Sequence, residues 1–148
     1  MTNQEIVEKL PYTKPFLFVD SITDVSQKHI SGTYRFAEDS DFYKGHFINF
    51  PVTPGVLLLE CMMQIGLVSL GIYLLRDKEF DLKKNATVAM VENSARFFKP
   101  VFPNEKVTVH SDLEYFRFHK LKSKVKMTNE AGEVVCSGVF SGILKPNE

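Results

Sequence analysis

The chain has 148 residues, of which 44% are hydrophobic and 24% are charged, the ordinary balance of one globular domain with a buried core. It carries 18 basic and 18 acidic side chains, so its formal net charge is zero, and no basic run suggests nucleic-acid binding. The N-terminal stretch MTNQEIVEKLPYTKP lacks the basic and apolar regions of a signal peptide, so we expect a cytoplasmic protein.

The two cysteines, Cys61 and Cys136, do not form a metal-binding pair, because no histidine lies at ligand spacing from either. We expect both to be buried thiols of a reducing compartment, and we expect no metal and no other cofactor. The 13 phenylalanines, with no tryptophan, could line an apolar slot, although core packing is the simpler explanation for any one of them.

The residue patterns predict, in chain order, a short helix, two strands, a loop or helical turn, one long apolar helix and about four strands. A strand bulge is predicted around 92–94, and alternation in a later strand puts Tyr115 on the same side as Leu113. One apolar helix with a long antiparallel sheet predicts an α+β domain whose sheet curls around the helix. The predicted elements span residues 3–10, 16–25, 29–36, 38–44, 56–75, 87–99, 106–118, 121–128 and 134–144.

The run 56–75 is apolar nearly all round, which is typical of a buried helix. Thr53 is the expected N-cap, and Pro54 is expected at the first helical position. A run of this length could instead span a membrane. Glu60 and Gln64 lie four residues apart on one helical face and argue against lipid exposure, so we expect no membrane span.

Glu60 is an unusual residue for such a helix, because ionisable side chains are rarely buried without a partner. It could be a partly solvated carboxylate favoured by the helix dipole. It could also be a catalytic carboxyl that donates a proton from a dry site. His46 precedes it across a loop rich in proline and glycine, and this combination favours the catalytic interpretation.

Residues 45–60, GHFINFPVTPGVLLLE, resemble the signature of the β-hydroxyacyl-ACP dehydratases of the FabZ and FabA type. LPYTKPFLFVD at 10–20 and NSARFFKPVFP at 93–103 resemble two further segments of that family, so the resemblance spans roughly residues 7–144. It implies a hotdog fold over 1–148. It also implies dehydration of (3R)-3-hydroxyacyl-ACP to trans-2-enoyl-ACP, in fatty acid or in polyene or polyketide biosynthesis.

The chemistry of this reaction suits the residues present. Loss of water from a 3-hydroxyacyl thioester needs a base at C2, an acid at C3 and donors for the thioester oxygen. Imidazole titrates near neutral pH, so His46 suits the base, and Glu60 suits the acid, directly or through a bound water. The first helical N–H groups, at Gly55 and Val56, have no intrahelical partner, so they are suited to donate hydrogen bonds to the thioester oxygen.

The family resemblance implies further roles around these groups. Gly55 donates to the thioester oxygen in family members, the carbonyl of Val52 orients the imidazole, and Gln64 helps to position the carboxyl. Glu60 matches FabZ, since FabA has Asp there and also isomerises the double bond, so we predict dehydration without isomerisation.

The spacer departs from the usual FabZ pattern, GHFPGHPVMPG. Ile48, Asn49 and Phe50 replace Pro, Gly and His, and Thr53 replaces Met. Acyl chain length therefore does not follow from the resemblance, and a specialised polyene or polyketide pathway is an alternative to housekeeping fatty acid synthesis.

The resemblance also implies partners. Relatives build each site across a homodimer interface, with His from one subunit and the acid from the other. Some relatives form trimers of dimers, and a second hotdog chain is an open alternative. Acyl carrier protein is acidic, so we expect basic residues at the mouth of the substrate tunnel. Each candidate for this role could equally be an ordinary solvated lysine or arginine. These candidates are Arg96, Lys99, Arg117, Lys120 and Lys122.

Two other functions compete with the dehydratase. A hotdog thioesterase would use a carboxylate and water near the same helix, but it does not require His46 at this spacing. A non-catalytic acyl-binding or partner subunit would be expected to lack His46 or Glu60, and both are present. The remaining histidines are expected on the surface, without a role in the site: His29, His110 and His119.

Overall fold

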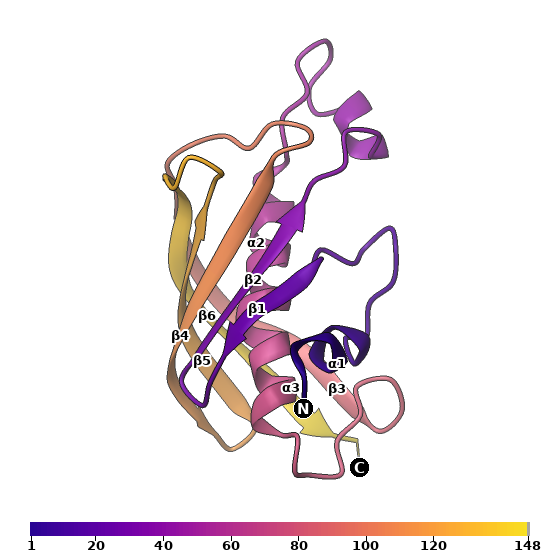
Figure 1. The fold of residues 1–148 in the computed structure, drawn as a ribbon, viewed down its shortest axis with the longest axis vertical. Helices are drawn as coiled ribbons and strands as arrows, with labels where there is room; N and C mark the ends of the chain where they lie inside the picture. The colour runs from indigo at the N-terminus through magenta and orange to yellow at the C-terminus, as the bar shows by residue number, and fades with distance from the viewer. Residues whose placement is uncertain (148) are drawn as a thin grey trace.

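Residues 1–147, which the computed structural model describes, form one antiparallel sheet of six strands wrapped around a central helix (Figure 1). The strand order across the sheet is β1-β2-β4-β5-β6-β3. This confirms the predicted α+β hotdog architecture. The helices are α1 (Asn3–Glu8), α2 (Gly55–Met63) and α3 (Leu70–Leu74), with a 3₁₀ turn at Asp41–Lys44 and a π-helical segment at Gln64–Ser69. The strands are β1 (Ser21–Val25), β2 (His29–Arg35), β3 (Ala86–Phe97), β4 (Lys106–Arg117), β5 (Lys120–Thr128) and β6 (Val134–Pro146).

The central helix runs without a break from α2 through the π-helical segment to α3. Its length and composition would suit a membrane span, yet 72% of its most apolar window is buried inside the fold. Glycines allow the sheet to approach: a Cβ at Gly66 would lie 3.0 Å from Val125, and one at Gly71 would lie 2.5 Å from Leu144. The helix is therefore the core around which the sheet packs.

The predicted strand over 16–25 is wrong in its first half, because β1 begins only at Ser21. Of the residues before it, Asp20 N–H bonds to the Thr33 carbonyl of β2, whereas Phe16 and Phe18 bond to a side chain of the central helix. Phe18 N–H donates to Gln64 Oε1 at 2.8 Å, and Gln64 Nε2 donates to the Phe16 carbonyl at 3.0 Å. The β-like composition of this segment reflects its packing against the helix.

The predicted start of the central helix also needs correction. The helix begins at Gly55, with Pro54 as the flanking residue, and Thr53 does not cap it. The Thr53 hydroxyl bonds instead to the Tyr43 hydroxyl at 2.5 Å, and Thr53 N–H donates to the Val101 carbonyl at 2.8 Å. Thr53 thus anchors the preceding loop to the body of the domain.

Two bulges shape the sheet. The bulge in β3 lies between Met90 and Glu92, just before the predicted position. The bulge in β4 lies between Leu113 and Tyr115, and it places these side chains on different sides, contrary to the prediction. Tyr115 does not pack against the core, and the Arg117 guanidinium lies 4.5 Å from the centre of its ring.

Candidate active site

The His46 imidazole is held by the loop that follows it. Its Nδ1 lies 2.9 Å from the Val52 carbonyl oxygen, and Val52 N–H donates to the His46 carbonyl, also at 2.9 Å. A carbonyl can only accept, so Nδ1 carries the proton and Nε2 keeps a free lone pair. The loop itself therefore fixes the tautomer that a general base needs.

The intervening residues form a tight turn. Phe47 N–H donates to the Phe50 carbonyl at 2.7 Å, and Phe50 N–H donates back to Phe47 at 3.0 Å. Asn49 adopts a φ of 59°, which its short polar side chain tolerates. The Phe47 ring stacks on the His46 imidazole, with the ring centres 4.0 Å apart. The replaced spacer residues thus still make an ordered loop.

A groove of about 400 Å³ lies beside His46, and Val52, Gly55 and Leu58 also line it. The backbone N–H groups of Gly55 and Val56 donate to no acceptor within residues 1–147. These are the positive end of the helix, so a negatively charged oxygen in the groove would meet free donors there. The groove therefore brings the predicted base together with Gly55, one of the two predicted oxyanion donors, whereas Val56 does not line it.

Phe97, which was not among the predicted site residues, also lines this groove. Its ring lies 3.2 Å from the position that a Cβ on Gly55 would take. Glycine is therefore the residue that lets the ring and the helix N-terminus approach this closely. An aromatic at this position of β3 carried no sequence signal that separated it from the other phenylalanines.

Glu60 is held by a different set of contacts. Gln64 Nε2 donates to Glu60 Oε1 at 3.0 Å, while the same amide bonds to the backbone of Phe16 and Phe18. The Cys61 thiol adds a bond to the Phe18 carbonyl at 3.3 Å. The N-terminal segment is thereby tied over the helix face that carries the carboxylate. Gln64 was predicted to position Glu60; the backbone partners were not foreseen.

In one chain, the structure does not bring His46 and Glu60 into one cavity. Glu60 is not among the residues that line the His46 groove. Its charge is felt instead by Tyr12, whose pKa is raised chiefly by burial and further by Glu60. In a single chain, the candidate residues thus lie in two separate groups, which we call half-sites: His46, Val52 and Gly55 in one, and Glu60 with Gln64 in the other.

Two of the predicted basic residues lie near the groove. Lys99 lines it and pairs with Glu133 at 2.7 Å. Arg96 lies on the exposed end of β3 beside Phe97. Both therefore lie at the end of the sheet that is next to the His46 groove.

The other basic candidates lie at the far end of the sheet. Arg117 and Lys120 flank the turn between β4 and β5, in which His119 is exposed with a φ of 64°. Lys122 Nζ lies 3.8 Å from Glu114 Oε2. The structure thus separates Arg117, Lys120 and Lys122 from the His46 groove.

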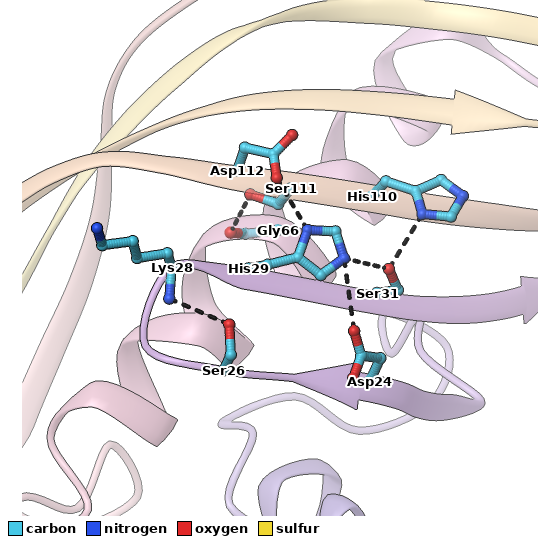
Figure 2. Close-up of polar contacts among 9 residues, drawn as sticks. All are labelled: Asp24, Ser26, Lys28, His29, Ser31, Gly66, His110, Ser111 and Asp112. Atoms are coloured by element: carbon cyan, nitrogen blue, oxygen red, sulfur yellow. Dashed lines mark hydrogen bonds and ion pairs between the residues drawn. The ribbon is translucent and has the colours of Figure 1, made fainter.

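His29 and His110 belong to a polar cluster on β2 and β4, shown in Figure 2. His29 Nδ1 lies 2.9 Å from Asp112, and its Nε2 lies 2.8 Å from the Ser31 hydroxyl, which is 3.0 Å from His110 Nδ1. Burial is the main cause that lowers the pKa of His110, and the charge of Lys126 adds to it. The cluster does not line the His46 groove.

Within the described residues, no group of three or more His, Cys, Asp or Glu side chains is arranged to hold a metal ion. Cys61 and Cys136 are both unpaired and buried, as predicted. Burial raises the pKa of Cys136 to about 11, and it raises that of Cys61 further. Both thiols are therefore protonated at neutral pH.

Comparisons with known proteins agree with this fold and these motifs. A family model described as a FabA-like domain matches residues 10–139. The 3-hydroxyacyl-[acyl-carrier-protein] dehydratase FabZ of Bacillus licheniformis is 37% identical over 135 residues, covering 90% of this chain and 88% of the relative. FabZ of Bacillus subtilis is 35% identical over 138 residues, covering 92% of each chain.

Solved structures share the fold at low sequence identity. A chain of the dehydratase heterocomplex ApeI:P from Xenorhabdus doucetiae matches with a TM-score of 0.79 and 14% identity, covering 98% of this chain and 92% of that one. A thioesterase from Haemophilus influenzae matches with a TM-score of 0.59 and 16% identity, covering 85% and 78%. On the match of the family model and the identity to the two Bacillus relatives, the chain belongs to the FabA-like family and is a FabZ-like β-hydroxyacyl-ACP dehydratase homologue.

Proposed function

We propose that this protein removes water from (3R)-3-hydroxyacyl-ACP to give trans-2-enoyl-ACP, with His46 as the base and Glu60 as the acid. One observation carries the proposal: the Val52 carbonyl holds His46 Nδ1–H at 2.9 Å, which leaves Nε2 free to accept a proton beside unbonded backbone donors. The family membership supports the same reaction, because the relatives are named for it.

The reaction balances with these groups alone. His46 Nε2 takes the C2 proton, and the charge that develops on the thioester oxygen is stabilised by the N–H groups of Gly55 and Val56. Glu60 gives its proton to the C3 hydroxyl, the C3–O bond breaks, and water leaves as the C2–C3 double bond forms. The proton on His46 returns to Glu60 through solvent, and no cofactor enters the cycle.

The complete site requires two chains in this proposal. The His46 groove of one chain lacks a carboxylic acid, and the Glu60 of the same chain lies outside it. In a two-fold dimer, the groove of each subunit would receive Glu60 of the other, so the isolated chain would be inactive. We propose a homodimer as the active unit, with trimers of dimers or a second hotdog chain as alternatives that mixing experiments can separate.

The substrate carrier is proposed to be acyl carrier protein in the cytoplasm. Lys99 is the leading contact, because it lines the groove and already holds an exposed carboxylate, Glu133, at 2.7 Å. Arg96 is the second candidate at this end of the sheet. We propose fatty acid synthesis as the pathway and dehydration without isomerisation, since the acid is Glu60 and not Asp.

The test uses the whole chain with 3-hydroxyacyl-ACP substrates of several lengths, and it follows the ultraviolet absorbance of the enoyl thioester. His46→Ala and Glu60→Gln should each reduce turnover by about 100-fold or more, as loss of a general acid or base requires. Melting temperatures should stay near that of the wild type for His46→Ala. Free thiol release without enoyl product would favour the thioesterase.

Mixing the two inactive variants tests the shared site directly. A mixed dimer has one site with both defects and one with none, so equal mixing should restore about one quarter of the wild-type rate after subunit exchange. No recovery, with exchange demonstrated by mass-tagged subunits, would contradict the shared site. No enoyl product from the wild type with any substrate would overturn the proposed reaction.

A further inference from the structure

One hydrogen bond joins the sheet to the central helix. The Ser111 hydroxyl, on the inner face of β4, donates to the Gly66 carbonyl of the π-helical segment at 2.9 Å (Figure 2). Within residues 1–147 it is the only hydrogen bond between a strand and this helix. The other contacts of this segment with β2, β4, β5 and β6 are made by buried side chains such as Ile65 and Leu67. Apolar contacts have no preferred direction, so this one bond is the directional contact between sheet and helix.

Glycine at position 66 allows the helix to come close enough for this bond. A Cβ at Gly66 would lie 3.2 Å from the Ser111 Cβ and 3.0 Å from the Val125 side chain. Ser111 and Val125 are paired residues of β4 and β5, so the helix backbone lies directly against the two strands. The fully buried hydroxyl of Ser111 therefore meets a carbonyl that only a close approach presents to it.

Polar contacts hold the helix on two sides at this level. On one side, the Gln64 amide bonds to the backbone of Phe16 and Phe18. On the other, Ser111 bonds to Gly66. Residues two apart on a helix point about 200° from each other, so these contacts act from roughly opposite sides. Glu60 lies one turn before Gln64 on the same face, and its position depends on how the helix is rotated between the two contacts.

A small rotation is enough to displace a general acid. A helix with its side chains has a radius of about 5–6 Å, so a rotation of about 10° moves the tip of a side chain by about 1 Å. A displacement of about 1 Å at a reacting group can slow a reaction about 100-fold. The Glu60 carboxyl therefore needs a helix whose rotation against the sheet is fixed.

We propose that Ser111 is a positioning residue for the acid: by holding the Gly66 carbonyl, it fixes the rotation of the central helix against the sheet and so the position of the Glu60 carboxyl. The inference rests on the proposed role of Glu60 and adds a residue to that site. The Ser69 hydroxyl differs, because it bonds to the Gln64 carbonyl within the helix and does not tie the helix to the sheet.

Ser123 provides a matched control. It is fully buried on β5, two residues before Val125, and its hydroxyl has no hydrogen-bond partner among the described residues. Ser111→Ala and Ser123→Ala thus remove the same oxygen atom from neighbouring strands, but only the first breaks a bond to the helix. Ser111→Cys keeps a side chain of similar size with a weaker donor.

Turnover of 3-hydroxyacyl-ACP by the whole chain tests the role. Ser111→Ala should lower kcat about tenfold and leave KM within about twofold, because the groove that receives the substrate is untouched. Ser111→Cys should have an intermediate kcat, and Ser123→Ala should match the wild type. Melting curves establish folding, and Ser111→Cys carries the comparison if Ser111→Ala does not fold. Full kcat in the Ser111 variants, or an equal loss in Ser123→Ala, would overturn the proposal.

A double variant shows whether Ser111 acts through Glu60. In a Glu60→Gln background, Ser111→Ala should cause no further loss of the residual turnover, since the acid that it positions is gone. A purely structural role would lower kcat by the same factor in both backgrounds, and that result would contradict the inference.

Hydrogen exchange tests the contact without any need for activity. Backbone N–H groups at 66–71 should exchange about fivefold faster in Ser111→Ala than in the wild type, and at the wild-type rate in Ser123→Ala. Unchanged exchange in Ser111→Ala would show that the bond does not hold the helix, whatever the enzyme does. Faster exchange in Ser111→Ala, with no enoyl product from the wild type, would overturn the proposed reaction and the role of Ser111 in it, while the hold on the helix would stand.

Discussion

The two half-sites are built in different ways. His46 is oriented by Val52, only six residues away, through bonds that close one loop. Glu60 is oriented by Gln64, whose amide is bound to backbone groups 46 and 48 residues away. The first half-site is a local structure placed on the fold, whereas the second is part of the contacts that hold the fold together.

This difference has a consequence for mutations. Changes near His46 should alter activity with little effect on stability, because the loop lies at the surface and bonds mainly to itself. Changes around Glu60 should alter both, because one buried amide serves the carboxylate and the N-terminal segment at once. Comparing activity with stability in each variant therefore tests the contrast.

The largest effect is expected for Gln64→Leu. This variant removes three hydrogen bonds and leaves the Phe18 N–H and the Phe16 carbonyl without their partner. We expect a loss of about 3 kcal/mol in the free energy of unfolding, together with a fall in turnover as Glu60 loses its orientation. Urea denaturation and the enoyl assay measure the two effects.

Ser69→Ala is the matched control for that variant. It removes one buried hydrogen bond of the same helix, from the Ser69 hydroxyl to the Gln64 carbonyl at 2.7 Å. A loss of about 1 kcal/mol with full activity is expected. Equal losses of stability and activity in the two variants would show that Gln64 contributes no more than any other buried hydrogen-bonding residue of the helix. The proposed contrast between the half-sites would then be wrong.

Gly55→Ala should have the next largest effect, and it should act on activity alone. The new Cβ would lie 3.2 Å from the Phe97 ring, which is half-exposed and can shift into the groove. Alanine favours the helix, so the melting temperature should not fall. We expect kcat/KM to drop about tenfold, less than full loss of an oxyanion donor.

Val56→Ala controls for a change at the same helical turn. Its side chain is 71% exposed, so neither activity nor stability should change appreciably. An unaltered kcat/KM in Gly55→Ala would remove the helix N-terminus from the proposed mechanism. A large fall in melting temperature would place this half-site among the contacts that hold the fold.

The sequence predicted the local half-site better than the distant one. His46, Val52 and Gly55 fall within one short motif, so their spacing already implied their proximity. The succession of strands along the chain and the buried helix were also predictable, because alternation and apolar periodicity are local signals, whereas the order of the strands across the sheet was not predicted. The segment 16–20 was predicted as strand because its composition is β-like. In the structure that composition reflects packing on Gln64, a contact 46 residues away in the sequence, which local patterns do not reveal.

Other errors have the same origin. Thr53 has the residue type and position of a helix cap, but the Tyr43 hydroxyl takes its side chain. The bulge that turns Tyr115 away from Leu113 depends on the register with β5. Each contact joins residues that local patterns do not relate, and the π-helical segment at Gln64–Ser69 likewise left no sequence signal.

Tyr43→Phe tests how firmly the His46 loop is attached. It removes the hydroxyl that bonds to Thr53 at 2.5 Å and leaves a buried Thr53 hydroxyl without that partner. We expect about 1 kcal/mol of lost stability and less than about a threefold change in kcat, because the bond to Val52 persists. A loss of activity as large as that of His46→Ala would show that this tether, too, orients the imidazole.

The smallest effect concerns the dependence of stability on pH. It distinguishes unfolding of the protein at low pH from loss of the active form of the base at low pH. Burial, together with the charges of Lys126 and His29, lowers the pKa of His110 below its ordinary value. The unfolded chain therefore binds more protons than the folded one as the pH falls through about 6.5, so stability should decrease with acidification. His110→Gln keeps a donor for Ser31 and should make the free energy of unfolding less dependent on pH between about 7.5 and 5.5.

The acidic limb of kcat/KM should be unchanged in His110→Gln, because the cluster lies outside the groove and His46 is left intact. If both the stability profile and the rate profile moved with His110, the acid limb would reflect unfolding and not protonation of the base. If only the stability profile moved, the pH dependence of the rate would arise from residues of the half-sites. It could then be measured in His110→Gln, in which the titration of His110 no longer affects the stability of the fold.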